Sequence, residues 1–232
     1  MGRADDKVAK NLLAIHKTPG VELLQSQSFT GDHGLTLVER APYGVIGAIT
    51  PCTNPTETLI NNAIGMLAAG NAVVFNPHPA ARRTSLLCID LMNRAAVQAG
   101  APDDLVCAVR EPSIETAQQL MAHPGVRLLV VTGGGGVVKA AMGSGKKCIA
   151  AGPGNPPVVV DPTADIQQAG VGIVRGASFD NNVICVDEKE VFVVESVADA
   201  LLDVMADSGA VRLSPRDTDR LHALLFPGGR LD

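Results

Sequence analysis

Short, continuously apolar segments alternate with longer segments of helical periodicity through the middle of the chain. Buried strands are expected at 43–49, 72–75, 105–109 and 126–133, and amphipathic helices at 56–71, 84–100, 113–123 and 135–145. Strands that are apolar along their whole length and are separated by helices are typical of a parallel sheet covered on both sides. The pattern therefore predicts an α/β fold with a doubly wound, largely parallel sheet.

Residues that begin or end helices mark the limits of these elements. Thr56 is a suitable N-cap for the first predicted helix, and Gly70 suits the position just after its last turn. Ser113 and Thr116 have the spacing of a capping box at the start of the third helix. The intervening stretch 76–83 is interpreted as a loop.

The pattern changes before this central region. A helix is expected at 4–17, and strands at 21–29 and 35–42 flank a turn at 30–34 that contains two glycines and an aspartate. The hairpin, at about 21–40, is either the edge of a sheet or an arm that pairs with another subunit.

A second set of elements follows the central region. Strands are expected at 146–152, 156–161 and 189–196, and helices at 163–179 and 197–209. The turn-rich stretch 151–157 predicts a boundary between a domain at 1–154 and the start of a second α/β domain at 155–232. The chain opens in what reads as the middle of a helix and closes without an element that would complete a core. We therefore expect it to be a piece of a longer protein.

Composition excludes several classes of function. The formal net charge is −5, Lys and Arg do not cluster beyond pairs, and aromatic residues make up 3% of the 232 residues. These features argue against nucleic acid and against an anionic membrane as partners. The sequence has no apolar run long enough to span a bilayer and no apolar signal core at its start. The five cysteines are spaced too irregularly for a disulfide framework or a zinc site, so we expect no metal and a reducing cytoplasm.

Three loops after predicted strands could carry chemistry. The first holds four glycines, 133–136, between a strand and a helix, which suits an anion held by backbone N–H groups and equally suits a tight turn. In the second, the amide of Asn54 could stabilise an oxyanion, although an Asx turn before a helix explains it as well. In the third, His78 lies between two prolines and is otherwise an ordinary surface residue.

Cys185 differs from the other four cysteines in its surroundings. Cys88, Cys107 and Cys148 lie within predicted apolar helices and strands, as small buried hydrophobic residues do, and Cys52 lies among prolines. Cys185 follows the polar segment FDNN and precedes a strand. Loops of this kind carry catalytic residues disproportionately, so Cys185 is the candidate nucleophile on these grounds, with a structural role still open.

Five segments together carry a resemblance to a known family. They occur in the order APYGVIGAITPCTNPTET, LAAGNAVVFNPHPAA, VVTGGGGVV, AAGPGNPPVVVD and GASFDNNVICVDEKE. The chain resembles the CoA-acylating aldehyde dehydrogenases of bacterial microcompartments, which serve propanediol and ethanolamine utilisation. The resemblance spans essentially the whole chain and implies a Rossmann-like NAD-binding domain, a catalytic domain and an oligomerisation hairpin.

The resemblance implies a role for individual residues. Cys185 would be the nucleophile, and its backbone N–H together with the Asn54 amide would hold the oxyanion. Hydrolytic relatives carry a PWNFP-type loop whose Asn falls opposite Thr53 in an ungapped alignment, so the identity of the second oxyanion donor stays open. The residues that fall where relatives line the cofactor are Thr50, Pro51, Pro77, His78, Thr132, Gly133 and Gly134.

One departure from the hydrolytic aldehyde dehydrogenases is informative. Those enzymes have a Glu-Leu-Gly-Gly segment whose Glu activates water, whereas this sequence has Ala-Gly-Pro-Gly at 151–154. Without a general base for water, a thioester on Cys185 can persist until a thiol arrives. In an alternative interpretation, Glu188 is the general base at a different position in the sequence. A glutamate also suits the solvent-exposed start of a strand.

These features predict an NAD-dependent oxidation of a short-chain aldehyde, propanal in the first place, to its acyl-CoA with coenzyme A as cosubstrate. An acetaldehyde-specific enzyme of ethanolamine utilisation, a hydrolytic dehydrogenase and a catalytically silent nucleotide-binding or assembly chain are the alternatives. The expected setting is the bacterial cytoplasm, within a microcompartment, as a homo-oligomer. Shell proteins or an alcohol dehydrogenase are the expected further partners.

Overall fold

A computed structural model describes residues 2–227 of the chain. The chain divides into two compact units, Met1–Gly154 and Asn155–Asp232. Within the described residues, no helix is both long enough and apolar enough to cross a membrane.

The first unit is built on a five-stranded parallel sheet. Its strands are β3 (Val45–Thr50), β4 (Ala72–Pro77), β5 (Val106–Ala108), β6 (Val126–Thr132) and β7 (Lys147–Ala151). They lie in the order β5-β4-β3-β6-β7, and each neighbouring pair is parallel. Along the sequence, β4 pairs with one edge of β3, and β5 then pairs with β4. The strand β6 pairs with the other edge of β3, and β7 pairs with β6. This arrangement confirms the predicted doubly wound sheet and places its switch point between β3 and β6.

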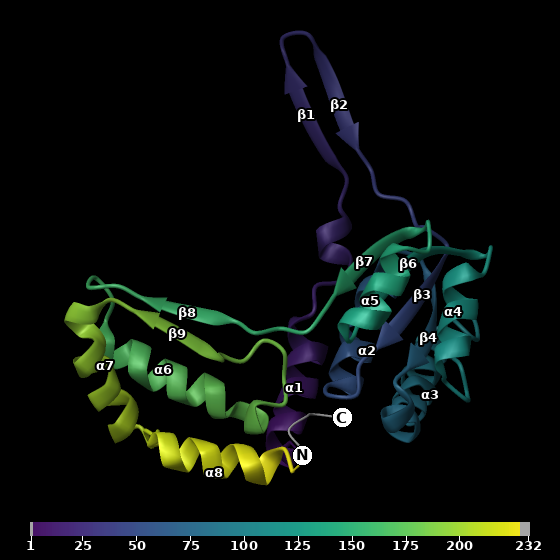
Figure 1. Ribbon diagram of the computed structural model, residues 1–232. Coiled ribbons are helices and arrows are strands. Elements are labelled where there is room, and N and C mark those ends of the chain that lie inside the picture. Colours follow the sequence, from purple (N-terminus) through teal and green to yellow (C-terminus); the bar gives the residue numbers. More distant parts are fainter. Residues whose placement is uncertain (1, 228–232) are drawn as a thin grey trace. The chain divides into compact units, whose positions relative to one another are not determined.

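Helices cover both faces of this sheet (Figure 1). One face packs against α2 (Pro55–Ala68) and α3 (Arg82–Gln98), and the other packs against α4 (Ile114–Ala122) and α5 (Gly135–Met142). Alternate strand residues point to opposite faces, and consecutive residues of one strand therefore enter different cores. The strand residues need to be apolar on both sides, which explains the continuous apolar runs in the sequence.

Two helix starts differ from the sequence-based prediction. The N-cap of α2 is Asn54, followed by Pro55, and not Thr56, because Pro suits the first helical position. The segment expected to be a loop at 76–83 instead forms a 3₁₀ turn at Pro79–Ala81 that leads directly into α3.

Two other helix limits match the prediction. Gly70 has a φ of +76°, the left-handed conformation expected just after a helix. The Ser113–Thr116 capping box is present at the start of α4. The sequence therefore located the helix ends well where a side chain or a glycine sets the geometry.

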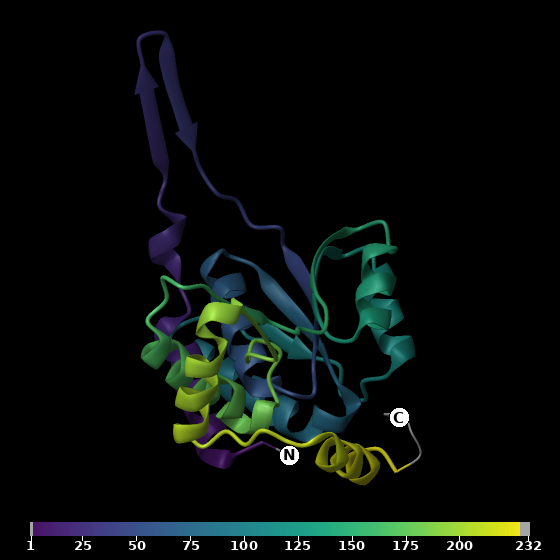
Figure 2. The ribbon, with the colours of Figure 1, turned by 60° about the vertical axis from the view of Figure 1, so that its left-hand side comes forward.

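A helix and a hairpin precede the sheet. Helix α1 (Ala4–Lys17) confirms the helix expected at 4–17, and it packs on α2. The strands β1 (Gln27–Gly31) and β2 (Gly34–Val38) are antiparallel, every residue in them is exposed, and the hairpin extends away from the sheet (Figure 2). The predicted strand at 21–29 is wrong in its first half, because Val21–Leu24 form a 3₁₀ turn.

The second unit holds a smaller parallel pair of strands. β8 (Pro157–Val160) pairs with β9 (Glu190–Val193), and α6 (Ile166–Ser178) and α7 (Glu195–Asp207) pack around a small apolar core. A further helix, α8 (Pro215–Leu225), was not predicted. None of its residues is buried, although Leu221, Leu224 and Leu225 form an apolar group in its last turn.

Candidate active site

A pocket of about 560 Å³ lies at the carboxyl ends of the central strands of the first unit. This is the switch point of the sheet, where open α/β sheets bind their ligands. The seven residues predicted to bind the cofactor all line this one pocket: Thr50, Pro51, Pro77, His78, Thr132, Gly133 and Gly134. They come from three separate segments of the sequence, and the parallel sheet brings them together.

Two helices complete the pocket with an apolar wall. Ile114, Ala117 and Met121 of α4 face the pocket together with Val137 and Ala140 of α5. The sequence-based prediction did not include these residues, because they look like ordinary helix-packing positions. An apolar slot beside a glycine-rich turn suits a flat aromatic base joined to an anionic group.

The Thr50 hydroxyl is a specific indication that the pocket takes a ligand. Thr50 is 2% exposed, and its hydroxyl oxygen has no hydrogen-bond partner within residues 2–227. Leaving such a group unpaired costs about 1–3 kcal/mol. Its carbonyl oxygen accepts a hydrogen bond from the His78 N–H at 3.1 Å, which ties the β4 loop to β3.

The glycine-rich turn has no space for a side chain at one residue and has space for one at the next. A Cβ added at Gly133 would lie 2.8 Å from Val137 Cγ1, whereas a Cβ at Gly134 would have no atom within 4 Å. Gly134 is also the N-cap of α5, and no side chain caps this helix start. Gly133 is therefore required for packing, and Gly134 leaves space beside a helix N-terminus that favours anions.

Asn54 lies outside the lining of this pocket and is held by two lysines of α1. Its Oδ1 accepts hydrogen bonds from Lys10 Nζ at 2.5 Å and from Lys7 Nζ at 3.3 Å, and Asn54 is 7% exposed. Lys10 Nζ also lies 3.6 Å from Glu57 Oε1. Because the amide oxygen faces the lysines, the amide nitrogen remains as the donor, with only a 3.4 Å contact to Thr53 Oγ1.

Sequence reasoning did not identify the two lysines that orient Asn54. The available signal was their spacing, because residues three apart lie on one face of a helix. Nothing in the sequence indicated that this face would meet the loop before α2. Lys7 Nζ also donates to the Thr53 carbonyl oxygen at 2.6 Å, which fixes the backbone of the same loop.

Cys185 lies in an exposed turn of the second unit, between α6 and β9. Three consecutive residues before it, Asp180, Asn181 and Asn182, have φ values of 50°, 55° and 58°. Such left-handed residues are uncommon outside glycine, although Asn and Asp tolerate them best. Asn182 Nδ2 braces the turn by donating to the carbonyl oxygen atoms of Ala177 at 2.8 Å and Glu188 at 3.3 Å.

The three cysteines expected to be buried, Cys88, Cys107 and Cys148, are only half-buried. Cys88 and Cys148 pack against the two cores of the first unit, and burial raises the pKa of both thiols. Burial also raises the pKa of Cys107, with a smaller contribution from the negative charge of Asp104. Cys52 is exposed, like Cys185.

The segment at 151–154 holds no carboxylate, since β7 ends at Ala151 and is followed by Gly-Pro-Gly. Glu188 lies against α6 in the second unit. Its carboxylate is so close to Gly176 that a Cβ there would lie 2.0 Å from Glu188 Oε2. Within the second unit, Glu188 is therefore packed on a helix backbone.

The chain belongs to the aldehyde dehydrogenase family, whose profile matches residues 7–217. It is 56% identical to the acetaldehyde dehydrogenase (acetylating) EutE of Salmonella typhimurium, over 97% of this chain and 49% of that protein. The chain therefore spans about half the length of such a relative.

Two solved structures extend the comparison. A propionaldehyde dehydrogenase from the fucose utilisation microcompartment of Clostridium phytofermentans is 47% identical, with a TM-score of 0.93, over 100% of this chain and 54% of that one. A Rhodopseudomonas palustris propionaldehyde dehydrogenase, solved with bound CoA and an acylated cysteine, is 53% identical, with a TM-score of 0.90, over 97% and 51%. These relatives confirm the resemblance to microcompartment aldehyde dehydrogenases.

Proposed function

We propose that this chain carries the NAD-binding part and the cysteine nucleophile of a CoA-acylating aldehyde dehydrogenase. The observation that carries the proposal is the convergence of seven residues from three loops on one pocket at the switch point of the sheet. The unpaired Thr50 hydroxyl and the open space at Gly134 fit a dinucleotide with a polar ribose and an anionic pyrophosphate. NAD⁺, when bound there, supplies the acceptor for a hydride.

The covalent step belongs to Cys185. Its thiolate attacks the aldehyde carbon to give a thiohemiacetal, and loss of hydride from that carbon leaves a thioester. The thiol of coenzyme A, as its thiolate, then attacks the thioester carbon and releases acyl-CoA and the Cys185 thiolate. The Asn54 amide nitrogen, oriented by the lysines on its oxygen, and the Cys185 backbone N–H would hold the oxyanion in both additions.

The lack of a carboxylate at 151–154 supports transfer to a thiol over hydrolysis. Water needs a general base to attack a thioester, whereas a thiolate does not. Glu188 is the alternative base, and its close packing on α6 argues against that role.

The relatives support a short-chain substrate. One is an acetaldehyde enzyme and two are propionaldehyde enzymes, at similar identity. We propose propanal as the preferred aldehyde and acetaldehyde as the alternative. We further propose a homo-oligomer that uses the exposed hairpin, in the bacterial cytoplasm and within a microcompartment, beside shell proteins or an alcohol dehydrogenase.

The test follows NADH formation from propanal or acetaldehyde with NAD⁺, with and without coenzyme A. We expect CoA-dependent NADH and acyl-CoA, and loss of at least about a thousandfold in Cys185→Ala, because the variant lacks the proposed nucleophile. Cys52→Ala is the matched control, since Cys52 is the other exposed cysteine, and it should retain activity. CoA-independent release of the free acid would contradict the proposal.

A second candidate is a silent nucleotide-binding chain, which the coverage of about half of each relative favours. Nucleotide binding measured by calorimetry without any NADH formation would support it. The chain can then be joined to the remaining half of a relative. Recovery of CoA-dependent activity in this fusion would support the first candidate function.

A further inference from the structure

A lysine side chain spans the turn that carries Cys185. Lys189 Nζ donates hydrogen bonds to the carbonyl oxygen atoms of Ile184 and of Asp187, each at 3.0 Å. One of these carbonyl groups comes directly before Cys185 in the chain, and the other comes two residues after it. The ammonium group therefore ties together the two sides of the Cys185 turn, residues 180–188.

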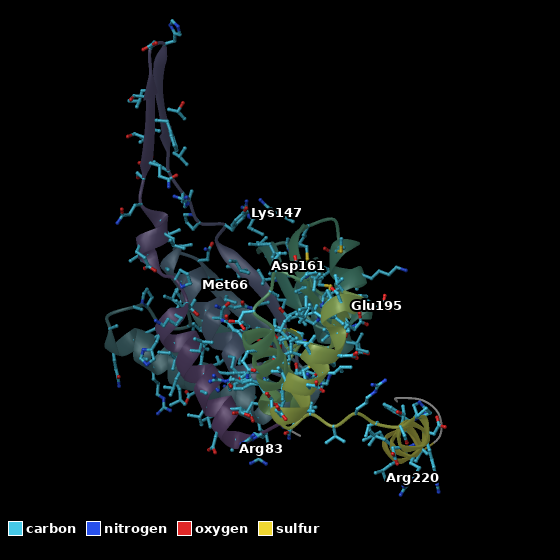
Figure 3. The ribbon with its side chains drawn as sticks, turned by 90° about the vertical axis from the view of Figure 1, so that its left-hand side faces the viewer. Met66, Arg83, Lys147, Asp161, Glu195 and Arg220 are labelled. Atoms are coloured by element: carbon cyan, nitrogen blue, oxygen red, sulfur yellow. The ribbon has the colours of Figure 1, made fainter. Side chains whose placement is uncertain are left out.

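The backbone holds Lys189 where its side chain can reach both carbonyl groups. Lys189 directly precedes β9, and its N–H donates to the Pro156 carbonyl oxygen at 3.1 Å, next to the start of β8. Glu195, which is labelled in Figure 3, lies beyond the opposite end of β9. Groups that start from a regular element are held more precisely than groups on a loop. Strand pairing therefore fixes the base of the lysine side chain.

The bond to Ile184 determines the direction of the Cys185 N–H. The Ile184 carbonyl and the Cys185 N–H belong to one planar trans peptide, so they point in opposite directions. Holding the carbonyl oxygen against the ammonium group therefore fixes the N–H as well. Within residues 2–227 this N–H donates no hydrogen bond, and Cys185 is exposed. The donor is oriented and remains available to a ligand.

The charge of Lys189 strengthens this arrangement. Among the described residues Lys189 forms no ion pair, so its ammonium group is not shared with a carboxylate. A hydrogen bond from a charged donor is stronger than one between neutral groups. A hydrogen bond accepted by a carbonyl also polarises its peptide and makes the N–H of that peptide a better donor. Lys189 should therefore both orient the Cys185 N–H and strengthen it.

We propose that Lys189 is a positioning residue for the Cys185 N–H, the donor that meets the oxyanion when Cys185 attacks a carbonyl carbon. The inference rests on the proposed function of Cys185 as the nucleophile and adds a residue to that site. Oxyanion stabilisation depends on donors that are oriented before the reaction begins. Lys189 provides this orientation through the Ile184 carbonyl, and it acts on the backbone and not on the substrate.

Two reactions of the Cys185 thiol separate positioning from a general effect on the thiol. In the first, the thiolate attacks the carbonyl carbon of p-nitrophenyl acetate, an oxyanion forms, and p-nitrophenolate leaves to give the thioester. In the second, the thiolate displaces iodide from the saturated carbon of iodoacetamide, and no oxyanion forms. Neither reaction needs NAD⁺ or coenzyme A, so neither depends on the nucleotide pocket at the switch point of the sheet. Mass spectrometry of peptides gives the rate at each cysteine, with the exposed Cys52 as internal reference.

Substitutions at Lys189 make the test. Lys189→Met should lower the acylation of Cys185 relative to Cys52 about tenfold and leave the alkylation ratio within about twofold, since removal of a whole oxyanion donor costs about 100- to 1000-fold and a loosened donor should cost less. Lys189→Arg keeps the charge and the donors, and its acylation ratio should stay within about threefold of the wild type.

A matched control covers the loss of charge alone. Arg175→Met removes a positive charge from the same unit, at an exposed side chain that bonds no carbonyl group of the turn within residues 2–227. Both ratios should be unchanged in this variant. Circular dichroism checks that each variant is folded, and alkylation of Cys185 checks that its thiol remains reactive.

Three results would overturn the inference. Lys189→Met could lower acylation and alkylation equally, or it could change neither. In the wild-type chain, Cys185 could favour the ester over iodoacetamide no more than Cys52 does, which would mean that no oxyanion donor is oriented beside it.

NADH formation judges the proposed function separately. CoA-dependent NADH from a chain that gives any of these three results would leave Cys185 as the nucleophile and would remove only Lys189 from the site. The expected ester result without NADH would overturn the proposed function and leave the positioning role of Lys189 in place.

Discussion

The nucleotide pocket and the Cys185 turn are held in place by different means. The pocket lies at the ends of strands whose residues are buried on both faces by four helices. The Cys185 turn lies beside a two-stranded sheet and depends on left-handed residues and a few side-chain hydrogen bonds. The first region takes its geometry from a large apolar core, and the second takes it from local polar contacts.

The two regions should therefore differ in the free energy that is lost when one side chain is removed. Removing a core side chain costs several kcal/mol, whereas a single hydrogen bond contributes about 1 kcal/mol. The pocket should therefore be rigid and sensitive to packing. The Cys185 turn should be sensitive to single polar side chains, and its opening should cost less than unfolding of the unit.

The largest expected effect comes from the core under the pocket. Phe75 is 0% exposed between β4 and the α2–α3 layer. Phe75→Ala should lower the free energy of unfolding of the first unit by about 3–5 kcal/mol, because it leaves a cavity. Phe29→Ala is the matched control, since Phe29 is 59% exposed on the hairpin and its removal should change stability by less than about 0.5 kcal/mol. Urea unfolding of both variants makes the measurement, and equal losses would contradict this contrast.

The next largest effect on stability concerns Asn182, whose side-chain hydrogen bonds support the Cys185 turn. Asn182→Ala loses both side-chain hydrogen bonds and places a less tolerant residue at a φ of 58°, which together should cost about 1–3 kcal/mol. Asn182→Gly loses the same bonds without the φ penalty and should cost roughly 1 kcal/mol less. Thermal unfolding and the alkylation rate of Cys185 measure the two variants. The prediction fails if Gly is as damaging as Ala.

The sequence predicted more of the structure of the nucleotide pocket than of the Cys185 turn. Apolar periodicity was enough for the parallel sheet, and the rule that ligands bind at strand carboxyl ends pointed to the His78 loop. The grouping of Thr50, His78 and Gly133 around one cofactor came from the resemblance. Periodicity carries no information on a turn such as 180–182, where the conformation depends on polar contacts. Cys185 was identified by the polar segment before it and by resemblance, and not by any pattern that predicts its backbone.

Other features could not be read from the sequence for simple physical reasons. The lysines on Asn54 depend on how α1 packs against α2, a tertiary contact between segments more than forty residues apart. The 3₁₀ turns at 21–24 and 79–81 are set by a few local hydrogen bonds. Helix α8 is an exception, because its Ser214 cap, the following Pro215 and the leucines of its last turn could have marked it in the sequence.

A smaller effect separates two adjacent glycines in the pocket. Gly133→Ala should destabilise the first unit by about 1–3 kcal/mol, because its Cβ would lie 2.8 Å from Val137. Gly134→Ala should cost at most about 1 kcal/mol, because Ala is a poorer N-cap than Gly, and it should weaken nucleotide binding, because the methyl group would occupy the open space. Urea unfolding together with 5′-AMP titration tests the pair. Equal effects on stability would show that the turn is not packed as the structure indicates.

The smallest expected effect is on thiol reactivity. Burial raises the pKa of Cys88, and the negative charge of Glu57 raises it further. A raised pKa leaves less thiolate at a given pH, so alkylation of Cys88 by iodoacetamide should set in at higher pH than for an ordinary exposed thiol. Glu57→Gln removes the charge and should speed the alkylation of Cys88 at about pH 8 by roughly two- to threefold.

A matched substitution makes this last comparison specific. Asp104→Asn should speed the alkylation of Cys107 and leave Cys88 unchanged, because the negative charge of Asp104 contributes to the raised pKa of Cys107 and that of Glu57 to the raised pKa of Cys88. Asn also tolerates the φ of 63° at this position. Mass spectrometry of alkylated peptides resolves each thiol. If Glu57→Gln slowed Cys88, or sped both thiols equally, the change would reflect loosened packing, and the electrostatic explanation would be wrong.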